Sequence, residues 1–381
     1  MYPAFRLILC AAASAYTLRE VICLKQRTAA LSLTAALLCG MLLLTQTAVQ
    51  TAAVLAERLA YCLQTLIPSL FGCTVLAELL QSTGCMQAEG GCLRQFAERC
   101  GLPPQILPVF LLSQIAGYPV GAGLLARETA AGTLRRESAV RLSYVCFGGG
   151  PAFLVGFAGA RLFGCAAAGW VMLSAAVLSN LLLFLVMPIP PHHIVHSVQP
   201  VRLDAETVSG AVSRTVQSMT AICGTVLLFG MLLHIADTLH LFGILSRVLH
   251  LPVQTVSAVC SAAADITQLP GLFHIGLPFR VLLPLCAGML SFGGCCAQMQ
   301  ACALGAAGLR FQRLAVMRIP AALMTALLTA AAAPLIPLPE SLPVFAPQAA
   351  VSQSGSVLPG LMILFTGLLA AGTVSAREQP S

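Results

Sequence analysis

Long stretches of the chain contain no Asp, Glu, Lys or Arg, and this limits the folds open to it. A bilayer core about 30 Å thick needs roughly 20 consecutive apolar residues for each helix that crosses it. Uncharged stretches of about this length or more recur along the chain: 28–56, 101–126, 142–160, 162–201, 281–309, 319–339 and 341–376. Of the 381 residues, 58% are hydrophobic and only 9% are charged, which is unlike a soluble domain. The sequence therefore predicts an all-α, polytopic, integral membrane protein.

Positive charges set the predicted topology. The arginines and the single Lys25 fall in short clusters between the apolar stretches, an arrangement that indicates cytoplasmic loops and not a nucleic-acid surface. Because Lys25 and its neighbouring arginines directly precede residue 28, we expect this flank in the cytoplasm. The path traced from there leaves Arg127, Arg214 and Arg318 among the cytoplasmic charges. It places four arginines outside: Arg58, Arg161, Arg247 and Arg280.

Two stretches are predicted to form re-entrant hairpins. Residues 101–126 have arginines near both ends, and Gly117 and Pro119 interrupt the middle of the stretch. Residues 253–275 would form a second hairpin from the outer face, interrupted between Asp265 and Gly271. Interrupted helices expose backbone NH and carbonyl groups that lipid cannot satisfy, so these groups must face protein or a wet cavity. We therefore expect both interruptions to lie inside the protein.

The two halves carry matching motifs in the same order. Leu102-Pro103-Pro104-Gln105 corresponds to Leu251-Pro252-Val253-Gln254, and Phe147-Gly148-Gly149 corresponds to Phe292-Gly293-Gly294. On the traced path one half starts from the outer face and the other from the inner face, so the repeats are predicted to be inverted. Inverted repeats with Gly/Pro interruptions in matching places are typical of secondary transporters, whose substrate site lies between the repeats.

The predicted division of the chain has six parts. In order they are an N-terminal segment without a firm placement, a first transmembrane helix, a gate-like membrane repeat, a cytoplasmic linker, a second gate-like repeat, and an outer loop with the last helix and tail. Their ranges are 1–27, 28–56, 57–187, 188–214, 215–337 and 338–381. The linker is rich in proline and carries His192, His193 and His196, which favour a solvated segment over a metal site because no acid or cysteine lies at ligand spacing.

Several motifs carry a family resemblance across residues 31–336. They are Pro68-Ser69-Leu70-Phe71, Ala77-Glu78-Leu79-Leu80, Ala116-Gly117-Tyr118-Pro119-Val120-Gly121-Ala122, Gly150-Pro151-Ala152-Phe153-Leu154-Val155-Gly156, Asp265-Ile266-Thr267, and Ser291-Phe292-Gly293-Gly294 with Gln298 and Gln300. At these positions the chain resembles the YlbJ-like sporulation integral membrane proteins, relatives of the nucleoside-transporter gate fold. The resemblance implies a multi-pass protein of endospore-forming bacteria. It would move dipicolinate, a small aromatic dicarboxylate, across the outer forespore membrane.

Candidate substrate-binding residues come from the two interruptions and the Phe-Gly-Gly motifs. They are Gln114, Gly117, Tyr118, Pro119, Gly149, Gly150, Asp265, Thr267, Gln268, Gly293 and Gln298, and Gln300 belongs with them. Their amide and hydroxyl groups could bind a substrate or hydrogen-bond one helix to another, and both interpretations stay open. Asn180, the sole asparagine, is expected to make an interhelical hydrogen bond. For Arg141 a loop charge that sets topology is favoured over a carboxylate partner.

Asp265 and Glu78 are the ionisable residues expected inside the membrane. Such a side chain is costly in a membrane and is usually functional, so we expect Asp265 to bind a coupling proton or cation if the cargo is an anion. The alternative is that Asp265 only caps a helix at the interruption. Glu78 lies near the inner end of its predicted span, where it either is functional or extends toward the interface.

The leading prediction is a permease for a small anionic metabolite, dipicolinate by resemblance. Two alternatives remain: a transporter of nucleosides or other organic solutes, and a non-transporting assembly factor of the spore envelope. The sequence contains no catalytic constellation, phosphate-binding loop or cofactor motif, and its sixteen cysteines form no C-x-x-C pair, so neither enzyme, cofactor nor metal is predicted. The expected partners are the lipid bilayer and a small anion, without nucleic acid, and a homo-oligomer stays open.

Overall fold

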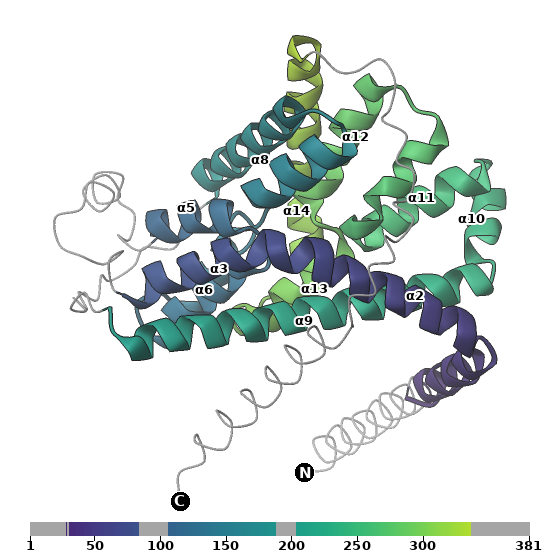
Figure 1. Ribbon diagram of the computed structural model, residues 1–381, viewed down its shortest axis with the longest axis horizontal. Helices are drawn as coiled ribbons and strands as arrows, with labels where there is room; N and C mark the ends of the chain where they lie inside the picture. Colours follow the sequence, from purple (N-terminus) through teal and green to yellow (C-terminus); the bar gives the residue numbers. More distant parts are fainter. Residues whose placement is uncertain (1–27, 29, 84–105, 188–202, 337–381) are drawn as a thin grey trace, which may run out of the picture.

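The computed structural model describes residues 28, 30–83, 106–187 and 203–336. The predicted segments 1–27 and 338–381, and most of the linker with its three histidines, lie outside these residues. The described residues form helices and turns without any strand (Figure 1), which confirms the predicted all-α class. Five of these helices have the length and composition needed to cross a membrane.

A helix of 35 residues, Ala48–Ser82, is the first long element. It consists of α2 (Ala48–Tyr61), a wide π turn η1 (Cys62–Leu66) and α3 (Ile67–Ser82). The predicted change of span near residue 57 is wrong, because the helix continues through Glu57 and Arg58 and a shorter helix, Ala30–Gln46, precedes it. The sequence prediction treated Arg58 as a loop charge, whereas a hydrogen bond to Gln268 holds it within the helix bundle.

Helix α9 (Ala205–Thr238) runs antiparallel to the Ala48–Ser82 helix, beside it in Figure 1. Arg214, near the start of α9, contacts Glu78 near the end of α3, and Gly230, further along α9, meets the side chain of Arg58 on α2. Asp204 caps α9 by accepting a hydrogen bond from the Thr207 backbone NH at 2.8 Å. The helix therefore begins ten residues before the predicted span at 215, within what was predicted as linker.

The first interruption is built from short elements. Helix α5 (Ile106–Ala116) ends before Gly117-Tyr118-Pro119, and α6 (Val120–Ala130) follows. After α7 (Arg136–Leu142), residues 143–150 are irregular, then comes the π-helix η3 (Ala152–Leu162) and the long α8 (Ala166–Val186). The predicted full crossing at 142–160 is therefore wrong, since the glycines at 148–150 delay the helix until residue 151 and η3 has only 11 residues.

The second half contains three breaks between helices. Helix α10 (Leu241–Leu249), which the sequence analysis did not predict, meets α11 (Val253–Ala264) at a bend of 113°. The chain then breaks at Asp265 and continues as a 3-10 helix, η4 (Ile266–Ile275). Helix α12 (Phe279–Phe292) and α13 (Gly294–Leu304) are separated at Gly293, whose φ of +84° suits glycine. Helix α14 (Phe311–Ala332) and a short turn, η5 (Ala333–Leu335), complete the described chain.

The interrupted segments of the two halves pack against each other in the core. A β-carbon added to Gly293 would lie 2.5 Å from the Phe147 ring and 3.6 Å from the Tyr118 ring. The rings of Tyr118 and Phe147 are themselves stacked, with centroids 5.0 Å apart. The predicted Phe-Gly-Gly motifs of the two halves are thus in contact, and the breaks at Gly117, Asp265 and Gly293 are buried in the protein.

Candidate functional site

A small cavity lies where the two interruptions meet. Its volume is about 40 Å³, enough for one or two water molecules. The residues around it come from both halves and from the π turn η1, and they include five of the predicted site residues. These five are Tyr118, Gly149, Gly150, Asp265 and Thr267, and Gln300 lines the cavity with them.

Asp265 occupies the break between α11 and η4 and is only 1% exposed. Its carboxylate accepts a hydrogen bond from the Thr267 backbone NH at 3.0 Å and another from the Thr267 hydroxyl at 2.7 Å. The predicted capping role is therefore confirmed. Among the described residues no cationic side chain forms an ion pair with Asp265. Because a charged carboxylate is costly in a dry site, a cap alone does not explain why an acid stands here.

Tyr118 contributes a second polar group to the cavity. Its backbone NH donates to the Gly148 carbonyl at 2.7 Å, which ties the first interruption to the irregular segment. Gly117 allows this approach, since a β-carbon there would lie 2.6 Å from the Gly150 nitrogen, and its φ is +75°. The Tyr118 hydroxyl is buried and has no hydrogen-bond partner in the structure. Pro119 follows as the residue before α6 and stays at the edge of this site.

A much larger cavity, which we call the vestibule, also borders the 265–271 segment. It has a volume of about 800 Å³, within the range of ligand-binding pockets. Its walls come from the end of α9 and from α10 and α11, with many polar side chains: Asp237, His240, Ser246, Arg247, Gln254, Ser257 and Ser261. Gln268 and Gly271 form the part nearest the small cavity. The second interruption thus contributes residues to both cavities: Asp265 and Thr267 to the small one, and Gln268 and Gly271 to the vestibule.

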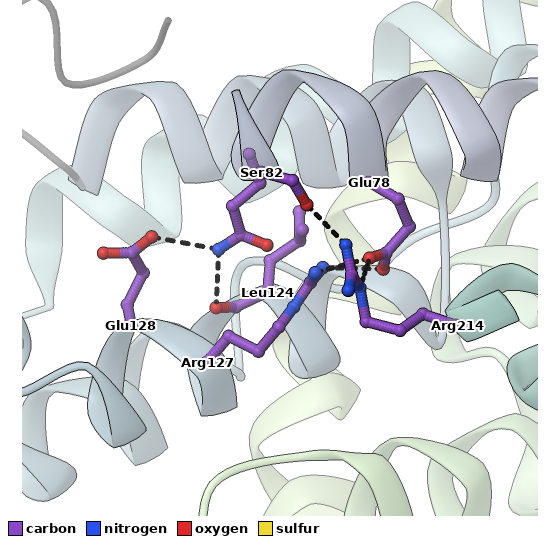
Figure 2. Close-up of polar contacts among 7 residues, drawn as sticks. Glu78, Ser82, Leu124, Arg127, Glu128 and Arg214 are labelled. Atoms are coloured by element: carbon purple, nitrogen blue, oxygen red, sulfur yellow. Dashed lines mark hydrogen bonds and ion pairs between the residues drawn. The ribbon is translucent and has the colours of Figure 1, made fainter. Parts of the chain in front are cut away.

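Glu78 belongs to a separate charged cluster, shown in Figure 2. It is 6% exposed and bonds both guanidinium nitrogens of Arg127, and its Oε2 lies 2.9 Å from Arg214 Nε. Arg214 also donates to the Ser82 hydroxyl at 2.5 Å. The two arginines, from α6 and α9, hold Glu78 near the end of α3, and both predicted roles of Glu78, functional and interfacial, stay predictions. Neither arginine is the free loop charge that the topology prediction assumed.

Arg318 differs most from its predicted position. Predicted as a loop charge, it lies within α14 and is 0% exposed. Its guanidinium donates to the Tyr144 carbonyl at 2.9 Å, to Asn180 Oδ1 at 2.7 Å, and to the carbonyl and hydroxyl of Ser291. It also lies 5.3 Å from the centre of the Phe147 ring. Arg318 therefore joins the two Phe-Gly-Gly regions to α8.

Some predicted site residues serve packing and not the cavity. Gln114 donates to the Val145 carbonyl and accepts from Asn180 Nδ2 at 2.9 Å, which confirms the predicted interhelical bond of Asn180. Gln298 donates to the Phe292 carbonyl at 3.0 Å and lines neither cavity. Arg141 lies on α7, away from both cavities. Gln114, Asn180 and Gln298 thus hold the interrupted segments in place.

No group of three or more His, Cys, Asp or Glu in the described part of the chain could hold a metal ion. No family model, curated protein or solved structure matches the chain.

Proposed function

We propose that the protein is a secondary transporter for a small anionic metabolite, with dipicolinate as the cargo that the family resemblance implies. On this proposal it acts in the outer forespore membrane during sporulation. The observation that carries the proposal is the small cavity where both interruptions meet. Its lining includes Asp265, a carboxylate without an ion pair among the described residues, and Tyr118, whose hydroxyl has no hydrogen-bond partner. Buried polar groups without partners are costly, and in membrane proteins they mark substrate or ion pathways.

The proposal includes two inverted repeats, each with a re-entrant hairpin. The antiparallel course of the Ala48–Ser82 helix and α9, the first long helix of each half, supports the inversion. The short helices α5 and α6 around Gly117, and the bend of 113° before α11, support segments that do not cross the membrane in one piece. Backbone groups at such breaks would face the cavities and not lipid.

Asp265 has a distinct role in this proposal. An anionic cargo is repelled by a carboxylate, so Asp265 would bind the coupling ion, a proton or a monovalent cation. Thr267 suits this role because its hydroxyl can donate to the charged carboxylate and can accept from the protonated one. The vestibule of about 800 Å³ would admit the cargo, and the 265–271 segment would have to move for it to pass.

Uptake of labelled dipicolinate into liposomes that contain the purified protein tests the proposal. We expect saturable uptake that falls at least about tenfold in Asp265→Asn and in Tyr118→Phe. Glu57→Gln is the matched control, because Glu57 is an exposed carboxylate on α2, away from both cavities, and uptake should not change. Each variant must elute as the wild type does on size exclusion.

The other outcomes decide against the proposal. Uptake of nucleosides without uptake of dipicolinate would favour an organic-solute transporter on the same scaffold. Absence of uptake for every solute tested, together with stable capture of a spore-envelope protein, would favour an assembly factor.

A further inference from the structure

Unpartnered polar groups gather around the second interruption. Among the described residues, five buried side-chain atoms without a hydrogen-bond partner come from this part of the protein: Arg58 Nε, Tyr61 OH, Tyr118 OH, His234 Nε2 and Gln268 Nε2. Arg58 Nε and Gln268 Nε2 can only donate, and the two hydroxyls and the imidazole can donate. Each of these five atoms could donate to a ligand group that accepts hydrogen bonds.

Arg58 is the charged member of this group. Its side chain crosses α9 at Gly230, where an added β-carbon would lie 2.9 Å from Arg58 Cγ. Its Nη2 donates to Gln268 Oε1 at 2.9 Å, while its Nε is buried without a partner. No carboxylate of the described residues forms an ion pair with Arg58. Asp265 acts on Arg58 electrostatically but does not touch it.

Gln268 connects Arg58 to the vestibule. It lines the vestibule wall, and its amide oxygen is taken by Arg58. Its amide nitrogen, which can donate two hydrogen bonds, is buried and makes none. The bond between Arg58 and Gln268 therefore brings two side chains with unused NH groups into contact, three residues after the break at Asp265.

Two aromatic side chains extend the same group by helical register. Tyr61 stands three residues after Arg58 on α2, and His234 stands four residues after Gly230 on α9. Residues at these spacings share a helix face. The position where Arg58 crosses α9 is therefore flanked on each helix by a further buried polar group without a partner.

We propose that Arg58 and Gln268 form a carboxylate-binding subsite behind the inner wall of the vestibule. Gln268 lines the vestibule, Arg58 lies behind it, and movement of the 265–271 segment would expose their buried donors. The guanidinium supplies the charge and a fixed pair of NH groups, which suit the two oxygens of a carboxylate, and the Gln268 amide adds a neutral donor. Gly230 makes the subsite possible by leaving room for the Arg58 side chain. The ligand class is a small organic anion with at least one carboxylate. This inference deepens the proposed transport function, but binding alone can test it.

The test is equilibrium binding of labelled dipicolinate to the purified full chain in nanodiscs of phosphatidylcholine, a lipid without a carboxylate. We expect Arg58→Met to weaken binding by about tenfold or more, because charge-assisted hydrogen bonds to a carboxylate are lost. Arg58→Lys should retain part of the affinity, since it keeps the charge without the paired NH groups. Gln268→Leu should weaken binding by a smaller factor. Gly230→Ala should also weaken it, because it displaces the Arg58 side chain.

Arg280→Met is the matched control, because Arg280 is an exposed arginine at the start of α12 and lines neither cavity. Its affinity should stay within about twofold of the wild type. The diamide of dipicolinate, which keeps the ring but has no carboxylate, should not compete. Size-exclusion profiles identify any variant that fails to fold, and Arg58→Lys then serves in place of Arg58→Met.

The outcomes separate this inference from the proposed function. Equal binding by wild type and Arg58→Met, or equal competition by the diamide, would overturn the carboxylate subsite even if uptake continued. Binding that depends on Arg58 without any uptake by the wild type would support the subsite and contradict transport. Binding of benzoate, with one carboxylate, that is lost in Arg58→Met would show that a single carboxylate suffices for this subsite.

Discussion

Two clusters that contain arginine lie along the Ala48–Ser82 helix and differ in how their charges are satisfied. Near the end of α3, Glu78 compensates Arg127 and Arg214, and the guanidinium of Arg214 has a further bond to Ser82. On α2, Arg58 has one neutral partner, Gln268, and a buried Nε that bonds to nothing in the structure. The first cluster is complete without a ligand, and the second is not.

The two clusters lie far apart along the Ala48–Ser82 helix. Arg58 and Glu78 are 20 residues apart, which is about 30 Å along a helix and close to the thickness of a bilayer core. Both clusters also contact α9, the complete one at Arg214 and the incomplete one at Gly230. We infer that the Glu78 cluster holds the two halves together near one face of the membrane. On the proposed function, the Arg58 cluster, toward the other face, would bind the carboxylate of the cargo.

The largest expected effect concerns Arg318, which shows what a fully satisfied buried arginine contributes. Arg318→Met should lower the free energy of unfolding by about 4 kcal/mol, because the acceptors at Tyr144, Asn180 and Ser291 lose their donors inside the core. The change is measured by thermal unfolding in detergent, monitored by the fluorescence of an added dye. Arg313→Met, at an exposed position on the same helix, is the control. A loss below about 1 kcal/mol would contradict the described network.

Breaking the complete cluster should have the next largest effect. Glu78→Gln removes the charge that compensates two arginines, and we expect a loss of about 2 kcal/mol. The effect is smaller than for a fully buried pair because the arginine side chains are 31% and 38% exposed. The same unfolding measurement applies, with Glu57→Gln as the exposed control on the same helix. If the two variants unfold alike, the Glu78 cluster does not hold α3, α6 and α9 together.

A smaller effect is expected where the small cavity meets the second interruption. Thr267→Val removes the hydroxyl that donates to Asp265 at 2.7 Å, and should cost about 1–2 kcal/mol. Thr220→Val is the control, since the Thr220 hydroxyl bonds only within its own helix, to the Val216 carbonyl. An equal loss in both variants would show that the Asp265–Thr267 pair has no special contribution to stability.

The smallest expected effect on stability is at Arg58, and it distinguishes the Arg58 cluster most clearly from the Glu78 cluster. Arg58→Met should change the free energy of unfolding by less than about 1 kcal/mol, because the lost bond to Gln268 is offset by removal of a buried, unpartnered NH group. Chemical unfolding in mixed micelles can resolve this difference from that of Glu78→Gln. A loss as large as that of Glu78→Gln would make Arg58 a structural residue.

The helical class and the importance of the interruptions could be predicted from the sequence. Uncharged runs indicate membrane helices directly, and Gly117, Pro119 and Gly293 mark breaks because few other residues fit such backbone. The small cavity accordingly contains predicted residues such as Tyr118 and Asp265. These signals are local, so they do not require knowledge of which helices touch.

The positions and partners of the buried arginines could not be predicted from the sequence. The positive-inside rule assigns each arginine to a loop, but Arg58, Arg127 and Arg318 lie within helices and depend on partners far along the chain. Arg318 bonds to residues that precede it by up to 174 positions, and no local pattern contains that information. The apolar neighbours Val316, Met317 and Ile319 were the available sign that Arg318 continues a helix.

The π turn at Cys62–Leu66 lies between Arg58 and Glu78 on one continuous helix. A π turn holds about one residue more than an α turn, so it shifts the direction of every later side chain by about 100°. The turn therefore compensates for a single additional residue in the sequence. Deleting one residue from this turn would let it close as an ordinary α turn, which would leave Glu78 facing Arg214 and Arg58 over Gly230, so both ends of the helix would keep their partners on α9.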